Sequence, residues 1–261
     1  MIKCFVRIII YAIVVQYIGM GAAQSKTDVP MSTPLETSAA PTTWGLINDT
    51  GIKACANAQR KVQCPVKGYP NQDAQFGQDV IYDEYSNGHA GFNFSKISST
   101  GDLLSPFAIS WDCVKDNVTG LFWEVKTDDG GLHDKDWTYS WYETNTGNNG
   151  SNVDVKASGF CGKTSVCDTA GFVKAVNTEG WCGYKDWRLP TVDELAGIAS
   201  LDRVDVAIDG NFFSETQSGY YWTSLPYASG NASAWSVSFS DGHGAANVKS
   251  NTLYVRLVRG E

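Results

Sequence analysis

Hydrophobic and polar positions alternate over residues 107–127, as they do in strands that bury one face. Leu121, Trp123 and Val125 occupy every second position in the second half of this segment. The residues DNVTG at 116–120 lie between the two halves and are typical of a turn. The pattern therefore predicts two antiparallel strands joined by a turn.

Similar strand patterns occur near the C-terminus, in the segments 219–224, 234–248 and 253–259. In the middle segment, Trp235, Val237 and Phe239 fall on one strand face and serines fall on the other. Asp241 and Gly242 are the residue types that a tight hairpin turn prefers. We expect an antiparallel arrangement here as well.

Two segments between these strand groups carry helix start and stop signals. In the first, Asp168 or Thr169 can cap the start and Gly180 can end the helix. In the second, Thr191 and Glu194 have the spacing of a capping box, in which each side chain bonds the other residue's free main-chain N–H. Two short helices among antiparallel strands and long loops predict an α+β domain, because alternating βαβ units are not seen.

The N-terminus has the layout of a cleavable secretion signal. Lys3 and Arg7 precede an apolar run at 8–18, and small residues follow up to Ala23. The run is shorter than the roughly 20 residues that cross a bilayer, so a retained anchor is the weaker alternative. We expect a signal peptide at 1–23, export, and no transmembrane segment after cleavage. Residues 24–44 are rich in Ser, Thr and Pro and predict a flexible tether.

Seven cysteines occur in the chain, and Cys4 lies in the expected signal peptide. The even number that remains suits disulfides in an oxidising compartment. These residues are Cys55, Cys64, Cys113, Cys161, Cys167 and Cys182. Pairing 55 with 64, 161 with 167 and 113 with 182 joins near neighbours, and other pairings stay open. A metal site is disfavoured because no pair has C-x-x-C spacing and no histidine lies near a cysteine cluster.

Formal net charge is -8, and the basic residues are scattered. This balance disfavours nucleic acid and anionic membranes as partners, because each phosphate contact needs Lys or Arg. Aromatic residues make up 12% of the chain and include nine tryptophans. Such rings serve both in core packing and in stacking on sugars or peptides.

The segments 127–150 and 225–233 predict long loops that combine flat rings with amide groups, as sugar-binding surfaces do. The candidate ligand-binding residues are Trp137, Tyr142, Asn145, Asn148, Asn149 and Tyr227. An ordinary loop with partly buried rings is the alternative. In contrast, Trp123, Trp187, Trp222 and Trp235 occupy alternating or motif positions and are expected in the core.

The acidic loop is a candidate calcium site, because carboxylate oxygens are the ligands that calcium prefers. The candidates are Asp128, Asp129, Asp134 and Asp136. Their spacing does not fit the EF-hand template, so a solvated acidic turn is the better interpretation. No other cofactor is expected.

The motif DWRLPT, followed by EL, is interpreted as structural. Arg188 can pair with Asp186 or bond nearby carbonyls, Pro190 ends a strand, and Thr191 begins a helix with Glu194 in its first turn. Trp187 belongs to the same motif.

These residues, with DNVTGLFWEVKTDDGGLHDKDWTYSWY upstream and YVRLVRG at the end, resemble the Lcl C-terminal family, the C-terminal domain of bacterial collagen-like adhesins. The resemblance covers residues 104–261 and leaves 45–103 as an N-terminal strand and turn extension with one disulfide. It implies a C-type-lectin-like fold, also found in formylglycine-generating enzymes, and a secreted, periplasmic or cell-surface location in a Gram-negative-type bacterium. Most family members have no assigned activity.

The leading hypothesis is an exported, non-catalytic binding or adhesion module for an extracellular glycan or protein. The first alternative is a structural envelope protein that self-associates. The second is an enzyme related to formylglycine-generating oxidases. Those enzymes use a reactive cysteine pair late in the domain, and no cysteine follows Cys182 here. No catalytic residues are assigned. The ligand and the oligomeric state are left open.

Overall fold

The structure, a computed structural model, describes residues 47–80, 86–142, 159–164 and 166–260. The described strands are β1 (Cys55–Ala56), β2 (Lys61–Val62), β3 (Phe94–Ile97), β4 (Cys113–Asp116), β5 (Phe122–Glu124), β6 (Tyr220–Pro226), β7 (Ser233–Ser238), β8 (Gly244–Val248) and β9 (Val258–Arg259). The described helices are α1 (Asp73–Phe76), α2 (Thr169–Glu179) and α3 (Val192–Ala196), with 3-10 turns η1 (Gln78–Val80) and η2 (Trp181–Gly183). This confirms the α+β class; the C-type-lectin-like fold stays a prediction.

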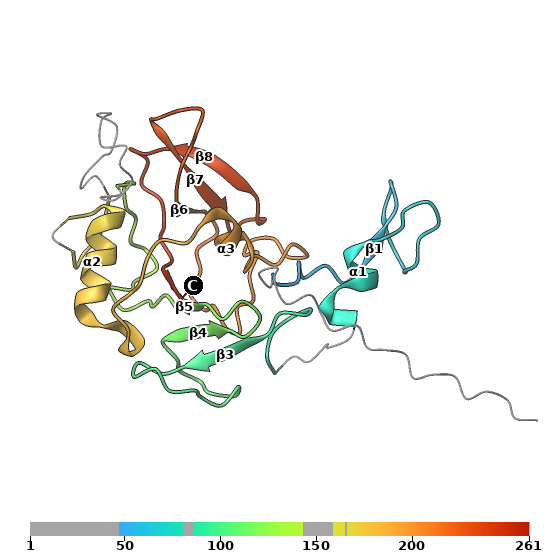
Figure 1. The fold of residues 1–261 in the computed structure, drawn as a ribbon, viewed down its shortest axis with the longest axis horizontal. Helices are drawn as coiled ribbons and strands as arrows, with labels where there is room; N and C mark the ends of the chain where they lie inside the picture. The colour runs from blue at the N-terminus through green and yellow to red at the C-terminus, as the bar shows by residue number, and fades with distance from the viewer. Residues whose placement is uncertain (1–46, 81–85, 143–158, 165, 261) are drawn as a thin grey trace, which may run out of the picture. The chain divides into compact units, whose positions relative to one another are not determined.

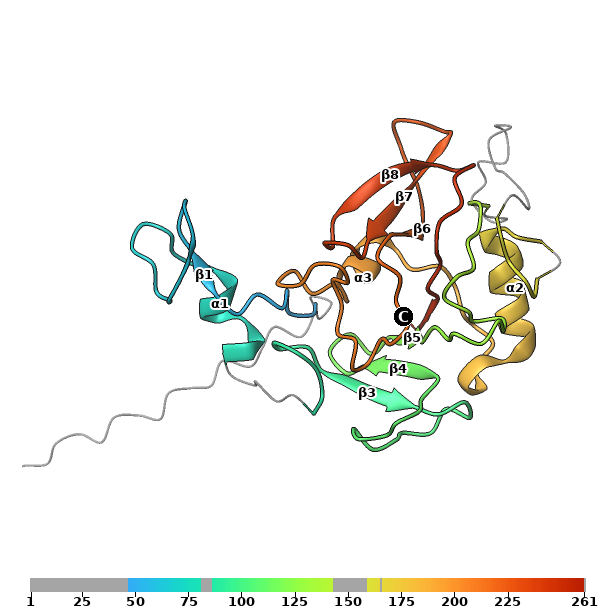
Figure 2. The same cartoon turned by 180° about the vertical axis from the view of Figure 1, so that it is seen from behind.

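Two antiparallel sheets form the body of the domain, with strand orders β3-β4-β5-β9 and β6-β7-β8. They lie on opposite sides of the body, and α2 flanks them (Figure 1, and from behind Figure 2). The predicted strand pair around DNVTG is β4 and β5, with Cys113 opposite Glu124. β9 pairs with β5, so the last residues of the domain complete a sheet that begins with β3, before residue 104.

Both predicted helices are confirmed together with their end signals. The Asp168 side chain accepts a hydrogen bond from the Gly171 N–H at the start of α2, and Gly180 ends α2 with a left-handed φ of 80°. Thr191 and Glu194 form the capping box at the start of α3. The segment NQDAQFGQD at 71–79 contains the one-turn helix α1.

Two hydrophobic cores hold these elements together. The first core packs β4 and β5 against α3 and β7, with Trp123, Leu195 and Val237 fully buried. The second core packs α2 against β6, with Phe172 of α2 and Trp222 of β6 fully buried. Trp123, Trp187 and Trp222 are core residues, as predicted.

The middle strand of the smaller sheet, β7, has buried residues on both faces. Val237 and Phe239 face the first core, and Ala234 belongs to the second. The serines on the polar face are buried as well, and Ser236 Oγ donates to the Ala245 carbonyl at 3.0 Å. The alternating pattern indicates the two faces of the strand correctly, but the polar one is covered by protein.

The predicted disulfides are confirmed, with bonds Cys55–Cys64, Cys113–Cys182 and Cys161–Cys167. Cys113–Cys182 ties β4 to η2 across 69 residues, and both cysteines are fully buried. In the part of the chain that the structure describes, no helix is long and apolar enough to cross a membrane. The signal peptide at 1–23 and the tether at 24–44 lie outside the described residues and stay predictions.

Candidate functional site

Tyr227 and Trp235 form an aromatic platform on the smaller sheet. Their ring centroids are 5.1 Å apart in an edge-to-face arrangement, and both side chains are half-buried. Trp235 lies opposite Ala246 on β8, and the neighbouring Val248 is 48% exposed. Trp235 is therefore a surface residue, and its assignment to the core is wrong. The physical reason is that Val237 packs in the first core with Val192 of α3, whereas Trp235 packs against Tyr227 outside both cores.

A second predicted loop reaches the same end of the sheet. The Trp141 N–H donates to the Lys249 carbonyl at 3.0 Å, and the Lys249 N–H donates to the Ala232 carbonyl at 2.8 Å. Lys249 thus joins the segment that ends at Tyr142 to the β6–β7 turn that holds Tyr227. The structure therefore brings the two predicted loops together at the end of β8.

The remaining predicted binding residues have other positions. The Trp137 indole donates to the Gly131 carbonyl at 2.6 Å and packs edge-on against Phe160. Trp137 therefore holds its own loop in place. The main-chain N–H and carbonyl of Tyr142 both bond Thr169 Oγ1. Asn145, Asn148 and Asn149 lie outside the described residues, and their role stays a prediction.

The acidic loop uses its carboxylates to shape the main chain. Asp134 accepts hydrogen bonds from the N–H groups of Asp129, Gly130 and Asp136. These bonds outweigh the effect of burial and hold the pKa of Asp134 below its ordinary value. Asp128 pairs with Lys135 at 2.7 Å. Within the described ranges, no group of three or more His, Cys, Asp or Glu side chains is arranged to hold a metal ion. Calcium binding stays untested.

The DWRLPT motif makes several structural contacts. The Arg188–Asp186 pair does not form, whereas the alternative, bonds from Arg188 to nearby carbonyls, is present. Arg188 forms a two-bond pair with Glu194, at 2.7 and 2.8 Å, and donates to the Gly260 carbonyl at 2.9 Å. Asp186 pairs with Arg259 instead of Arg188. The hydrogen bond from Arg259 holds the pKa of Asp186 below its ordinary value. The motif therefore links α3 and the edge of the sheet to Arg259 and Gly260.

We expect Arg188→Ala to lower the free energy of unfolding by about 1 to 2 kcal/mol, because it removes a bidentate pair that is partly exposed. Chemical unfolding followed by fluorescence measures this change. Asp186→Asn is the matched control: Asp186 is 58% exposed, and its loss should cost less than Arg188→Ala. Equal effects of the two variants would contradict the connector role.

A buried ionic cluster in the second core was not predicted. The Glu124 carboxylate accepts from Lys126 Nζ at 2.9 Å, from the Leu257 N–H at 2.9 Å, and bonds His133 Nδ1 at 2.8 Å. Arg256 donates to the Glu124 carbonyl at 3.3 Å. The side chains of Glu124, Lys126, His133 and Arg256 all belong to residues that are at least 96% buried. Burial alone would raise the pKa of Glu124, but Lys126 and His133 lower it to about 2.

The cluster stabilises the meeting point of β5, the acidic loop and the last strand. His133 comes from the loop and stacks on Trp181, with ring centroids 3.7 Å apart. Glu124 and Lys126 occupy strand positions opposite to the apolar residues, where a sequence pattern indicates a solvent face. The second core covers this face, so the alternation of residues contained no signal of the cluster.

These observations define a disulfide-bonded α+β domain with an aromatic surface platform. Residues 112–259 match the family model described as the Lcl C-terminal domain. The chain therefore belongs to this family, and the resemblance carried by DWRLPT and the neighbouring motifs is confirmed. No curated protein sequence matches the chain.

Proposed function

We propose that this protein is an exported, non-catalytic module that binds an extracellular glycan or protein through the aromatic platform of Tyr227 and Trp235. The observation that carries this proposal is the position of the platform. Its rings lie outside both hydrophobic cores and are half-exposed. A half-exposed aromatic ring that a sheet and a neighbouring ring hold in place is suited to stack on a sugar ring or an apolar side chain at low entropic cost.

Two further features support export and the absence of catalysis. The three disulfides suit an oxidising compartment outside the cytoplasm. They also pair the six cysteines that follow the expected signal peptide, whereas the related oxidases depend on a reactive cysteine pair. We therefore place the protein in the periplasm, at the cell surface or in the medium of a Gram-negative-type bacterium.

We expect Tyr227→Ala and Trp235→Ala each to weaken ligand binding about tenfold, because a central aromatic contact typically contributes 1 to 2 kcal/mol or more. The full-length chain, expressed and exported, is first screened on glycan and host-protein arrays with and without calcium. The affinity of each hit is then measured for the variants.

Tyr69→Ala is the matched control, because Tyr69 is also exposed, at 44%, and lies outside the family domain. Reduced protein serves as the control for fold dependence. Array ligands that still bind the reduced protein, or that bind both platform variants as tightly as wild type, would rule out the platform as the binding surface. A requirement for calcium in the array would support a metal site in the acidic loop.

A further inference from the structure

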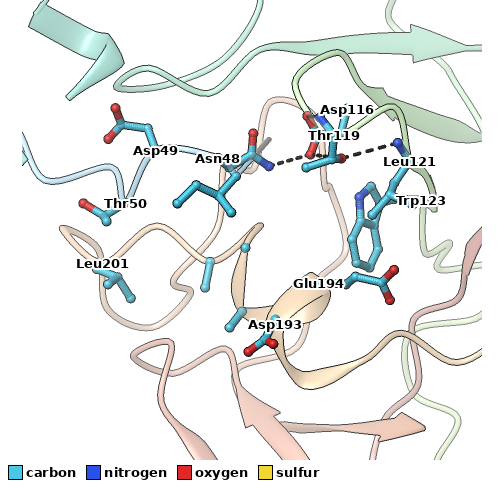
Figure 3. A pocket seen from close by; sticks show the side chains of 14 residues that line it. Asn48, Asp49, Thr50, Asp116, Thr119, Leu121, Trp123, Asp193, Glu194 and Leu201 are labelled. Atoms are coloured by element: carbon cyan, nitrogen blue, oxygen red, sulfur yellow. Dashed lines mark hydrogen bonds between the residues drawn. The ribbon is translucent and has the colours of Figure 1, made fainter. Parts of the chain in front are cut away.

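A pocket of about 450 Å³ lies between the segment 48–50, the β4–β5 turn and α3. Asn48 and Thr50 lie on one side of it and Trp123 and Glu194 on the other (Figure 3). The N-terminal segment is held across the pocket because Asn48 Nδ2 donates to Asp116 Oδ2 at 2.5 Å and the Leu201 N–H donates to the Thr50 carbonyl at 2.8 Å. Pockets of this size accommodate small ligands and short peptides.

The walls of the pocket are mainly apolar, yet two of the residues that line it have buried polar atoms without a partner. The apolar side chains are Ile47, Leu121, Trp123, Ala196, Ala199 and Leu201. Trp123 is fully buried, and no protein atom accepts its indole N–H. Asn48 Oδ1 is likewise buried and receives no hydrogen bond. Both atoms are closed to solvent, so a ligand would pair with them only after a side chain of the pocket wall moves aside.

The free indole of Trp123 is unusual within this protein. Six other tryptophans donate their indole N–H to a main-chain carbonyl: Trp111, Trp137, Trp141, Trp181, Trp187 and Trp222. Buried donors in folded proteins nearly always have an acceptor, because an unpaired one loses its bond to water without replacement. Trp123 is therefore suited to donate to a carbonyl oxygen that a ligand brings.

The pocket is strongly acidic. Its lining includes Asp49, Asp116, Asp193 and Glu194, and it includes no Lys or Arg. Across the described ranges, Glu194 is the member of this group with a cationic partner, Arg188. Asp49 and Asp116 accept main-chain N–H groups, and Asp193 is exposed at the start of α3. The uncompensated negative charge favours a ligand with a cationic group.

We propose that this pocket binds a short peptide in which a lysine or arginine lies next to an apolar residue. A peptide main chain supplies both a carbonyl for the Trp123 indole and an N–H for Asn48 Oδ1. The apolar side chain fills the wall beside Leu121 and Ala199, and the cationic side chain lies near Asp193. This site is separate from the aromatic platform and does not depend on its function.

The test uses the full-length, exported chain with nitrogen-15 in its indole groups. The Trp123 indole signal is assigned with Trp123→Phe. Three capped dipeptides are titrated at millimolar concentrations: N-acetyl-leucyl-lysine amide, N-acetyl-leucyl-glutamine amide and N-acetyl-leucyl-glutamic acid amide. The lysine peptide is expected to shift the Trp123 signal with saturation and to bind more tightly than the other two. The indole signals of the six hydrogen-bonded tryptophans serve as internal controls of the fold.

Asp193→Asn should weaken the lysine peptide about two- to fivefold and leave the glutamine peptide unchanged, as expected for a partly exposed ion pair. Asp102→Asn is the control, because this exposed aspartate follows β3 at the end opposite to the Asp116 turn. The proposal is overturned if none of the peptides moves the Trp123 signal, or if the glutamic acid peptide binds as tightly as the lysine peptide. Binding of the array ligands to the Tyr227→Ala variant is measured separately, so that failure of the pocket and failure of the aromatic platform can be distinguished.

Discussion

Glu124→Gln is expected to lower the free energy of unfolding by about 3 to 5 kcal/mol, the range found when one partner of a buried ion pair is removed. The carboxylate is fully buried and bonds Lys126, His133 and the Leu257 N–H. Glutamine keeps the shape of the side chain but leaves the buried ammonium of Lys126 without its counter-charge. Urea unfolding at neutral pH measures the change.

Glu179→Gln is the matched control for this variant. Glu179 also faces His133, at 3.5 Å, but it is 46% exposed, so its loss should cost under about 1 kcal/mol. The pH dependence adds a second readout of the same variant. Because folding lowers the pKa of Glu124 from 4.5 to about 2, its contribution is complete above pH 4.5 and declines as the pH falls toward 2. The stability difference between wild type and Glu124→Gln should therefore narrow over this interval, and a constant difference would argue against the ion pair as its source.

Removing the Cys113–Cys182 bond, with alanine at both positions, is expected to cost about 4 kcal/mol, because the bond closes a long loop in the unfolded chain. The two cysteines are 69 residues apart and join β4 to η2 inside the second core. Unfolding midpoints of the variant and of wild type, both in the oxidised state, give the difference.

The Cys55–Cys64 bond provides the comparison, because it closes a separation of 9 residues outside the family domain. The same alanine replacement there should cost about 2 to 3 kcal/mol by the loop-length relation. A larger loss at Cys55–Cys64 than at Cys113–Cys182 would contradict the expected order. It would also show that the N-terminal segment contributes more to the fold than its few core residues suggest.

Several elements were predictable because their signals are local. The Thr191–Glu194 capping box, the Asp168 cap and the left-handed Gly180 each act within one helical turn. The strand pair around DNVTG follows from alternation and a turn between adjacent segments. The disulfides also agreed with the pairing of near neighbours, and the family resemblance rested on contiguous motifs.

The sites depend on contacts between distant parts of the chain. Asp186 pairs with Arg259 across 73 residues, and Asn48 reaches Asp116 across 68. These partners are too far apart in the sequence for a local residue pattern to predict the contacts. Trp235 has the same alternating position as Val237, yet Val237 is buried in the first core and Trp235 lies outside both cores. The platform could be predicted only through Tyr227, and the pocket at Trp123 not at all.

Local sequence therefore determines where helices and strands begin, which strand positions share a face, and to which family the chain belongs. Tertiary packing decides which of those faces meets water. The face of β5 with Glu124 and Lys126 is covered by the second core, whereas part of the β7 face with Trp235 stays open. The reason is physical: burial depends on the elements that come to lie over a strand, and these are set by the arrangement of the whole domain.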